Sequence, residues 1–453
     1  MRAIVVGAGE VGYHIAKRLD KEGHDVTIIE ENSAVKERVE KELDVMTIQG
    51  NGASPAALEA AGVAKTDMVI AVTDEDEVNL VISLLAKQSR GKKSIKTIAR
   101  VRNPEFSKNP SLQSGKALGI DHLINPNQAV AEEITRLVQN PAAAQVAFFA
   151  EGKVELLGID VRPEAPALRQ RLKDLGSFQA QHPFIVTAIS RNDELHIPYG
   201  ETVIEPGDRL YLVAHRDDIP DILNRLGRQE EPPREVLIIG GGRIGRCLAE
   251  ILEAEAEGIR ITLIERNRKR CEELAEHLKR AKVIVGDGTD VQALAEEGIA
   301  EMDAVVTVSD DEATNILAAL LLKKRLNAKK AIALVQRSHF IQLASSLGID
   351  AISPRLTTAS AILRSVRRGR VVSVVEMPEW DAEIMELVAL PTTPVVDRPL
   401  REVNMPKGAI VAAISRGEQI IIPKGDTCIL PDDRVILFTL PEAIPKVEEL
   451  FSG

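Results

Sequence analysis

Residues Ile4-Val5-Val6-Gly7-Ala8-Gly9-Glu10-Val11-Gly12 form the stretch that decides the fold. An apolar run leads into glycines spaced G-x-G-x-x-G, after which Val11, Ile15 and Leu19 recur at helical spacing. The pattern predicts a buried strand that ends at Gly7 and a helix that begins near Gly9. In a dinucleotide-binding unit the first glycine makes a tight turn, the second lets a pyrophosphate approach, and the third packs helix on strand. The helix N-terminus presents free N–H groups to that phosphate.

An acidic residue follows at the expected distance. The next apolar run, Asp25-Val26-Thr27-Ile28-Ile29, ends in Glu30, about 20 positions after Gly9. A carboxylate at that strand tip accepts hydrogen bonds from a ribose 2′-OH. The same arrangement returns in Val236-Leu237-Ile238-Ile239-Gly240-Gly241-Gly242-Arg243-Ile244-Gly245, and Glu265 ends the next apolar run. The glycine fingerprint occurs twice, and each time an acidic residue, Glu30 or Glu265, ends the following apolar run. This repetition predicts nucleotide binding.

The bulk composition narrows the function classes. The 453 residues are 44% hydrophobic and only 3% aromatic, and the net charge is −11. Few aromatic side chains argue against stacking of single-stranded nucleic acid, and the negative charge argues against duplex DNA, so we expect no nucleic-acid partner. The sequence has no apolar run long enough to span a bilayer and no secretion signal. The three cysteines are expected to be reduced, buried thiols, and the scattered histidines predict no metal site.

Alternating strands and helices up to residue 139 indicate an α/β fold with a doubly wound parallel sheet, whose ligand crevice lies at the strand C-termini. Residues 154–159, 184–190 and 208–213 then predict the strands of a small α+β module. Both parts repeat after residue 236. The sequence thus predicts two tandem Rossmann-like sheets, each followed by a small α+β module. The expected domains are 1–139, 140–228, 234–369 and 370–453, with a linker at Glu230-Glu231-Pro232-Pro233.

Further motifs recur at equivalent strand ends of the two halves. Gly50-Asn51-Gly52 is repeated as Gly286-Asp287-Gly288, and Val72-Thr73-Asp74-Glu75 as Val308-Ser309-Asp310-Asp311. Ala99-Arg100-Val101-Arg102 ends the fifth strand of the first half. The candidate ligand contacts of the first half are Gly7, Ala8, Gly9, Glu10, Val11, Gly12, Glu30, Asn51, Thr73, Asp74 and Arg100. Those of the second half are Gly240, Gly241, Gly242, Arg243, Ile244, Gly245, Glu265, Asp287, Ser309 and Asp310.

This order of motifs resembles the RCK (regulator of K⁺ conductance) family, also called KTN, in the two-copy form that serves Trk potassium uptake systems. The resemblance covers essentially the whole chain. It implies a cytoplasmic regulator that is not an enzyme, is peripheral at the inner face of the cell membrane, and binds NAD(H), ATP or ADP in its large lobes. It also implies a homo-oligomeric gating ring, most simply a tetramer, under a potassium-translocating Trk membrane subunit.

Alternative interpretations remain for several residues. Asp74 and Asp310 are either ligand contacts or helix N-caps, and left-handed backbone geometry alone explains Asn51 and Asp287. Arg100 either binds a phosphate or pairs with a carboxylate such as Asp74. Leu334 aligns with Arg100, so we expect two unequal sites, with the first favouring ligands that are richer in phosphate charge.

Two other functions remain possible for the whole protein, and one apolar helix face has two possible packing partners. A nicotinamide-dependent oxidoreductase would need a proton donor or acceptor in the small modules, where no convincing group is found. A scaffold that has lost its ligand is disfavoured by the presence of both Glu30 and Glu265. The predicted helix over 126–138 carries the apolar stripe Val130, Ile134, Leu137 and Val138. This stripe packs either within its own lobe or against its counterpart in a second subunit.

Overall fold

The computed structural model divides the chain into two compact units. The first comprises Met1–Ile134 and Glu235–Val366, and the second Thr135–Arg234 and Arg367–Gly453. Both large modules therefore share one unit, although a small module separates them in the sequence. The structure describes residues 1–21, 23–89, 95–107, 109, 120–140, 143–192, 194–226, 233–255, 258–296, 299, 301–366, 371–377 and 382–451. Residues 230–232 of the predicted linker lie outside these ranges.

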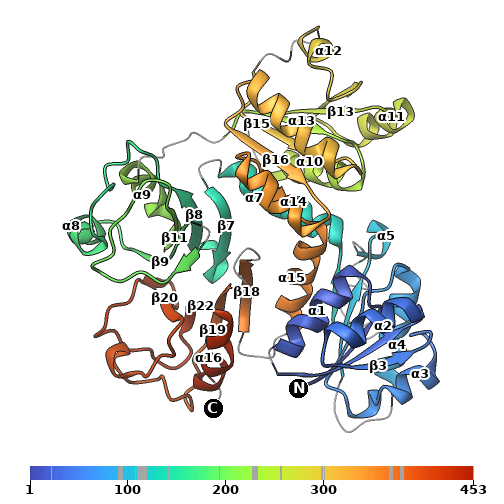
Figure 1. Cartoon of the computed structure of the whole chain (residues 1–453), viewed down its shortest axis with the longest axis horizontal. Coiled ribbons are helices and arrows are strands. Elements are labelled where there is room, and N and C mark those ends of the chain that lie inside the picture. Colours follow the sequence, from blue (N-terminus) through green and yellow to red (C-terminus); the bar gives the residue numbers. More distant parts are fainter. Residues whose placement is uncertain are drawn as a thin grey trace. The chain divides into compact units, whose positions relative to one another are not determined.

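The first large module is a six-stranded parallel sheet in the order β3-β2-β1-β4-β5-β6, coloured blue to teal in Figure 1. Its strands are β1 (Arg2–Val6), β2 (Asp25–Glu30), β3 (Met46–Gln49), β4 (Met68–Ala71), β5 (Lys96–Arg100) and β6 (His122–Ile124). Its helices are α1 (Glu10–Lys21), α2 (Ser33–Glu42), α3 (Pro55–Ala60), α4 (Asp76–Gln88), α5 (Pro104–Ser107) and α7 (Pro126–Gln139). The strand order reverses between β1 and β4, which places the predicted crevice beside the glycine fingerprint.

The second large module has the same topology, β14-β13-β12-β15-β16-β17, again all parallel. Its strands are β12 (Glu235–Ile239), β13 (Arg260–Glu265), β14 (Lys282–Val285), β15 (Ala304–Thr307), β16 (Lys330–Leu334) and β17 (Asp350–Ile352). Its helices are α10 (Arg243–Glu255), α11 (Arg268–His277), α12 (Val291–Glu296), α13 (Glu312–Arg325), α14 (Ser338–Ser346) and α15 (Pro354–Val366). The predicted duplication of a doubly wound sheet is therefore confirmed.

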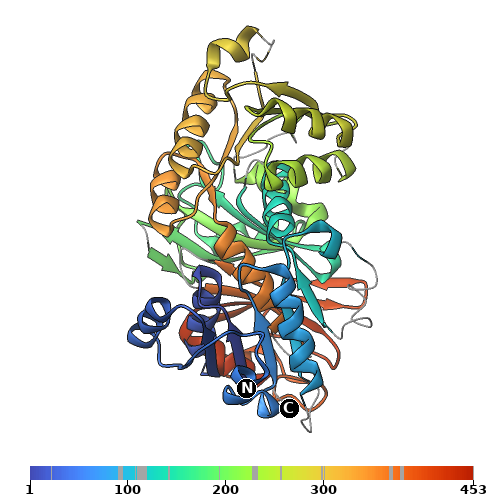
Figure 2. The same cartoon turned by 90° about the vertical axis from the view of Figure 1, so that its right-hand side faces the viewer.

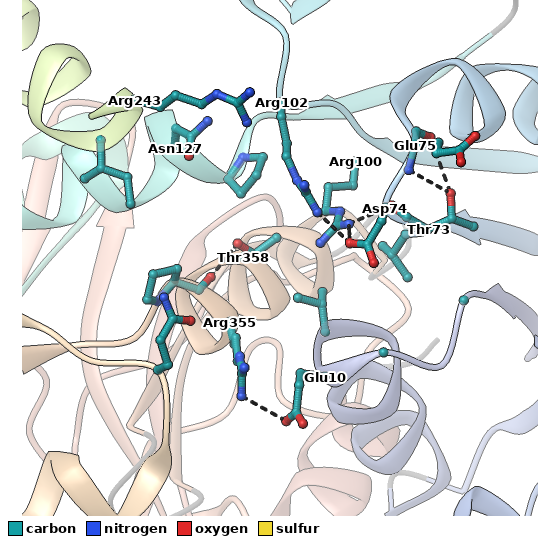
Figure 3. A pocket seen from close by; sticks show the side chains of 18 of the residues that line it. Glu10, Thr73, Asp74, Glu75, Arg100, Arg102, Asn127, Arg243, Arg355 and Thr358 are labelled. Atoms are coloured by element: carbon teal, nitrogen blue, oxygen red, sulfur yellow. Dashed lines mark hydrogen bonds and ion pairs between the residues drawn. The ribbon is translucent and has the colours of Figure 1, made fainter. Parts of the chain in front are cut away.

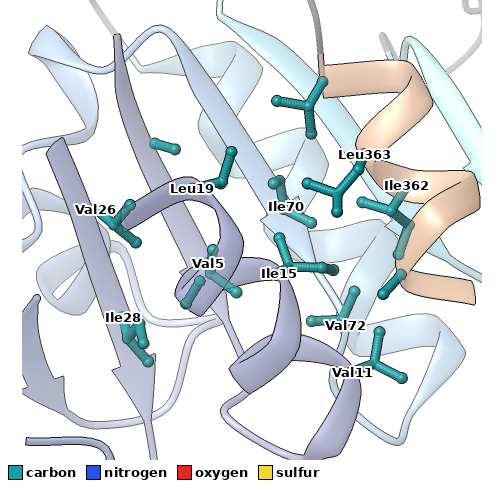
Figure 4. Packing of buried hydrophobic residues seen from close by; sticks show 14 of the residues in the cluster. Val5, Val11, Ile15, Leu19, Val26, Ile28, Ile70, Val72, Ile362 and Leu363 are labelled. Atoms are coloured by element: carbon teal, nitrogen blue, oxygen red, sulfur yellow. The ribbon is translucent and has the colours of Figure 1, made fainter. Parts of the chain in front are cut away.

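Helix α15 follows the second sheet in the sequence but packs on the first. Ala359, Ile362, Leu363 and Val366 belong to the same buried cluster as Val11, Ile15 and Leu19 of α1 (Figure 4). Figures 1 and 2 both show the orange α15 beside the blue α1. Because leucine and isoleucine side chains are removed from water at this contact, it ties the two large modules together by ordinary hydrophobic burial. The sequence analysis did not predict this crossing.

The second unit holds the two small modules, each built on a five-stranded antiparallel sheet. The first sheet consists of β7 (Ala143–Phe149), β8 (Val154–Asp160), β9 (Phe184–Arg191), β10 (Glu194–His196) and β11 (Arg209–His215). The second consists of β18 (Val371–Met377), β19 (Ala382–Val388), β20 (Ala409–Arg416), β21 (Gln419–Ile421) and β22 (Arg434–Thr439). Phe149 and Tyr211 of the first module share one buried cluster with Ile384 and Phe438 of the second. The predicted α+β modules are thus confirmed, and they pack against each other.

Smaller expectations had mixed outcomes. The stripe of Val130, Ile134, Leu137 and Val138 on α7 is buried in the chain, so it offers no free surface to another subunit. Of the free cysteines, Cys271 is buried as expected, but Cys247 and Cys428 are only partly covered. Among the described residues, no helix combines the length and apolar character needed to cross a membrane.

Candidate functional site

The fingerprint glycines have the geometry that their spacing predicts. Gly7 has a φ of +96° and Gly240 a φ of +108°, a left-handed conformation that favours glycine in the turn after each strand. A Cβ added at Gly12 would overlap the carbonyl oxygen of Gly7, and Gly245 has the same relation to Gly240. By contrast, a Cβ at Gly9 or Gly242 would have no heavy atom within 4 Å. The turn and packing roles are therefore visible in the fold, and the middle glycine of each loop faces open space.

The two acids at the ends of the second strands are hydrogen-bonded to these loops. Glu30 Oε2 accepts from the Ala8 N–H at 2.6 Å, and Glu30 Oε1 accepts from the Asn32 N–H at 2.8 Å. Glu265 accepts in the same way from Gly241 and Asn267, each at 2.8 Å. Burial raises the pKa of Glu265, but these two N–H donors and the guanidinium of Arg270 together outweigh it and hold the pKa below its ordinary value. A fixed, charged carboxylate beside the loop can still accept a ribose hydroxyl, since each oxygen has a second lone pair.

The Gly-Asn/Asp-Gly turns differ from the left-handed geometry expected for them. Neither Asn51 nor Asp287 has a positive φ. Instead, Asn51 Oδ1 accepts from the Ala53 N–H at 2.8 Å, and Asp287 Oδ1 accepts from the Thr289 N–H at 2.9 Å. These are side-chain-to-backbone turns, in which the side chain and not the backbone angle makes the bend. The hydroxyl and N–H of Thr289, with the guanidinium of Arg266, lower the pKa of Asp287 to about 2.

The glycine that ends each of these turns is required by packing. A Cβ at Gly52 would overlap the side chain of Val6, and one at Gly288 would overlap Ile239. The turn therefore lies directly on the first strand of each sheet, beside the fingerprint loop. Asn51 lines the cavity described below, whereas Asp287 does not.

A buried asparagine organises the next two strand ends. Asn79 is fully buried in α4, and its Oδ1 accepts from the N–H of Thr73 at 2.9 Å and from its hydroxyl at 2.8 Å. Its amide nitrogen donates to the carbonyl oxygens of Thr73 and Arg100. Asn315 repeats these bonds to Ser309 and Leu334. Thr73 and Ser309 are thus held in place by an asparagine six residues later.

Asp74 and Asp310 are not N-caps, so that interpretation is wrong. The N-caps of α4 and α13 are Glu75 and Asp311, and only Asp311 makes the side-chain cap hydrogen bond. Asp74 Oδ1 instead accepts from Arg100 Nη2 at 2.9 Å and from Arg102 Nη2 at 2.6 Å (Figure 3). Bonds from Arg100 and Arg102 hold the pKa of Asp74 below its ordinary value.

In the structure Arg100 therefore forms an ion pair with Asp74, which is one of the two alternatives expected for it. Arg100 Nη2 also donates to the carbonyl of Thr73 at 2.6 Å, while Arg100 Nε is buried without a hydrogen-bond partner among the described residues. The equivalent residues of the second half, Leu334 and Gln336, carry no charge. The expected preference of the first site for phosphate-rich ligands relied on unpaired guanidinium groups, and Asp74 offsets part of their charge.

Both fingerprints open on one cavity of about 1280 Å³ within the first unit. The predicted residues that line it are Gly7, Gly9, Glu10, Val11, Glu30, Asn51, Thr73, Asp74, Arg100, Gly241, Gly242, Arg243, Ile244, Ser309 and Asp310. Those outside its lining are Ala8, Gly12, Gly240, Gly245, Glu265 and Asp287. The lining also includes Arg102, Asn127, Arg246, Arg270 and Arg355, which were not among the candidates. Clustered guanidinium groups beside two helix N-termini suit a phosphorylated ligand.

Comparison with known proteins supports one family over the whole chain. The TrkA-N domain model matches residues 3–126 and 236–354, and the TrkA-C domain model matches residues 156–227 and 384–452. The Trk system potassium uptake protein TrkA homolog 1 of Methanosarcina mazei is 38% identical over all of both chains. The chain belongs to the TrkA family. The TrkA protein of Vibrio alginolyticus is 35% identical over 100% of this chain and 98% of its own.

Solved structures with lower sequence identity have a similar fold. The GsuK RCK domain has a TM-score of 0.59 at 17% identity, covering 99% of this chain and 94% of that one. The GsuK channel bound to NAD has a TM-score of 0.60 at the same identity, covering 99% of this chain and 78% of that one. At this identity the likeness concerns the fold alone.

Sequence reasoning missed two kinds of residue in this TrkA-family site. Asn79 and Asn315 were not among the candidates, although a polar residue between the apolar positions of a buried helix already signals a hydrogen-bonding role. Arg355 lies three residues after Ile352, where β17 of the other half ends, and no local pattern connects it with Glu10. Its place at the first loop follows from the crossing of α15, which only the structure reveals.

Proposed function

We propose that this chain is the nucleotide-binding regulatory subunit of a Trk-type potassium uptake system. In this proposal it is cytoplasmic, lies at the inner face of the cell membrane, and acts on a potassium-translocating membrane partner. Full-length relatives named as Trk potassium uptake proteins support the assignment to such a system. Nucleotide occupancy would bias the arrangement of the large modules, and that change would be passed to the partner.

One observation carries the nucleotide part of the proposal. Two phosphate-type loops, at Gly7–Gly12 and Gly240–Gly245 in the sequence, open on the same cavity with a carboxylate bonded to each loop. Carboxylates, hydroxyls, amides and guanidinium groups of the lining match the ribose and phosphate groups of NAD(H), ATP and ADP. The candidate residues of both halves are proposed as the contacts.

The first test is thermal unfolding of the full chain with NAD, NADH, ATP and ADP. A ligand that binds only the folded state raises the unfolding temperature by an amount that grows with its concentration. We expect at least one of the four to do so. Unfolding temperatures that do not respond to any of them at millimolar concentration would contradict nucleotide binding.

The second test assigns the sites. Gly9→Val and Gly242→Val each introduce a side chain where the loop faces open space, so we expect folded proteins with normal circular dichroism. Each variant should lose binding in its own half, because the added side chain stands where the pyrophosphate approaches. Undiminished binding in both single variants and in the double variant would refute the assigned residues.

The assembly and the partner need separate experiments. We propose a closed homo-oligomer, most simply a tetramer, which light scattering at micromolar concentration checks directly. A monodisperse monomer would contradict it. For the partner, potassium uptake by cells that express the membrane subunit should depend on this chain, and the Gly9→Val,Gly242→Val double variant should uncouple uptake from the nucleotide supply.

The rival function is a nicotinamide-dependent oxidoreductase. It predicts steady consumption of reduced nicotinamide with some member of a carbonyl panel, whereas a regulator binds the cofactor without turnover. Absorbance of the reduced nicotinamide over hours separates the two. Turnover that disappears in the Gly9→Val,Gly242→Val double variant would favour the enzyme.

A further inference from the structure

The two phosphate loops carry opposite charges at the same position. Glu10 is the first residue of α1 and directly follows Gly9, while Arg243 is the first residue of α10 and directly follows Gly242. Both side chains line the shared cavity. The backbones of the two loops are alike, with the same turn glycine and the same packing glycine. At this first helical position the two loops therefore differ in the sign of the side-chain charge.

The helix that faces each loop also differs. Arg355 Nη1 of α15 lies 3.3 Å from Glu10 Oε2, an ion pair that Figure 3 marks with a dashed line. Arg355 directly follows Pro354, and the residue that directly follows Pro126 at the equivalent start of α7 is Asn127. Arg243 and Asn127 lie together in another part of the same view. One loop is therefore associated with a carboxylate and a guanidinium, and the other with a guanidinium and an amide.

Packing keeps Arg355 close to the first loop. Downstream of it, Ile362 and Leu363 are buried in the core cluster of α1, as Figure 4 shows. The hydroxyl of Thr357 donates to Glu133 Oε2 of α7 at 2.6 Å. With α15 held at these points, the Arg355 side chain can neutralise Glu10 without a movement of the backbone.

Charge at this position acts on the ligand through Coulomb's law. A nucleoside triphosphate carries one more negative charge than the corresponding diphosphate. The Glu10 carboxylate, with about half of its side chain exposed, sits at the start of the helix that receives the phosphate chain. The carboxylate therefore repels a triphosphate more strongly than a diphosphate. Arg355 weakens this repulsion.

We propose that Glu10 makes the first loop prefer a nucleoside diphosphate over a triphosphate, and that Arg355 limits this preference by pairing with Glu10. The proposal depends on nucleotide binding as proposed above and adds the ligand choice of one site. It is opposite in sign to the preference that the sequence suggested from Arg100. The reason is that Asp74 offsets part of the charge of Arg100 and Arg102, whereas Glu10 lies at the start of the helix that follows the loop, where the second loop carries Arg243.

The test is calorimetric titration of ADP and ATP into the full chain carrying Gly242→Val, so that the first loop alone remains open. Glu10→Gln keeps the size of the side chain and removes its charge. We expect the ratio of ATP affinity to ADP affinity to rise about tenfold. Arg355→Gln leaves Glu10 uncompensated and should lower the same ratio. Glu37→Gln on the exposed face of α2, outside the cavity lining, is the matched charge control and should not change it.

The outcomes separate the two proposals. If the Gly242→Val protein binds neither ADP nor ATP, nucleotide binding by the first loop is wrong. If it binds both, and Glu10→Gln changes the ratio no more than Glu37→Gln does, the role of Glu10 is wrong. If Glu10→Gln raises the ratio but Arg355→Gln leaves it unchanged, the part assigned to Arg355 is wrong. Circular dichroism of each variant verifies that it is folded.

Discussion

Glu30 accepts a hydrogen bond from the backbone N–H of Ala8 at 2.6 Å, so the acid at the tip of β2 is fixed to the phosphate loop of β1. Glu265 is fixed to Gly241 in the same manner. These bonds join a strand end to a loop more than 20 residues earlier, and each bonded carboxylate oxygen keeps a second lone pair that can accept a further hydrogen bond. Each sheet thus presents a ribose acceptor and a phosphate loop as one connected unit.

This arrangement predicts a choice of sugar. The carboxylates of Glu30 and Glu265 accept a 2′-OH and repel a 2′-phosphate, so NAD(H) should bind at least about tenfold more tightly than NADP(H). Calorimetry with both cofactors measures the ratio. Glu30→Gln together with Glu265→Gln should narrow it, since the repulsion is removed. Tighter binding of NADP(H) to the unmodified chain would refute this role for the two acids.

The third fingerprint glycine predicts a large difference between neighbouring substitutions. In Gly12→Ala the new Cβ would overlap the carbonyl oxygen of Gly7, so the helix or the loop must shift, at a cost of at least about 2 kcal/mol. Gly9→Ala is the matched control, because its Cβ meets nothing within 4 Å. Urea unfolding of both variants gives the two free energies. Equal stabilities would mean that the close approach of α1 to the loop is not required.

The Asn79 bonds predict a second stability effect. Asn79→Ala would leave the N–H and carbonyl of Thr73 and the carbonyl of Arg100 without their side-chain partner, which costs about 2–4 kcal/mol for buried groups. The same loss is expected for Asn315→Ala in the second half. Asn224→Ala, at an exposed position of α9 (Ile219–Arg225), serves as the control in the same unfolding experiment. A cost near that of the control would show that water replaces the lost bonds.

Glu155 predicts a pH dependence of stability in the small modules. It lies in β8, is 3% exposed, and burial raises its pKa from 4.5 to about 7, against the opposing effect of Arg216. Because the folded chain holds the proton more tightly than the unfolded chain, stability falls as the pH rises from about 4.5 to about 7. The loss amounts to roughly 3 kcal/mol.

Substitution isolates the contribution of this residue. Glu155→Gln should remove that part of the pH dependence, so the difference in unfolding free energy between the variant and the unmodified chain should grow across the same window. Glu164→Gln changes an exposed carboxylate of the same module and should leave the pH profile unaltered. Parallel profiles for the unmodified chain and Glu155→Gln would contradict the raised pKa.

The fold was largely predictable because its determinants are local. The apolar runs, the glycine at each strand end and the spacing to Glu30 predicted both parallel sheets and the positions of both loops. Prediction failed where a side chain has several partners of similar chemistry. Asp74 was suited to a cap, an ion pair or a ligand, and only the folded geometry brings it to Arg100 and Arg102. For Asn51, the side-chain turn gives the same bend as the left-handed backbone that was expected.

The hydrophobic spacing in the sequence could not predict the contacts between the two halves of the chain. Ile362 and Leu363 mark an apolar face of a helix, but hydrophobic spacing does not specify which core that face enters. It enters that of α1, and this choice brings Arg355 to Glu10. The ion pair at the first loop therefore depends on tertiary packing between segments that are more than 300 residues apart in the sequence.

The passage of α15 onto the first sheet bears on how such a chain arose. A gene encoding only the first half would produce a large module whose α1 face lacks its apolar cover, and the equivalent helix available to it would be α7 of a second, identical molecule. Two such products would complete each other by exchanging helices. Duplication followed by fusion then makes that exchange intramolecular. After fusion the two copies are free to diverge, as the opposite charges of Glu10 and Arg243 illustrate, while deletion of the second half would uncover the α1 face of the first.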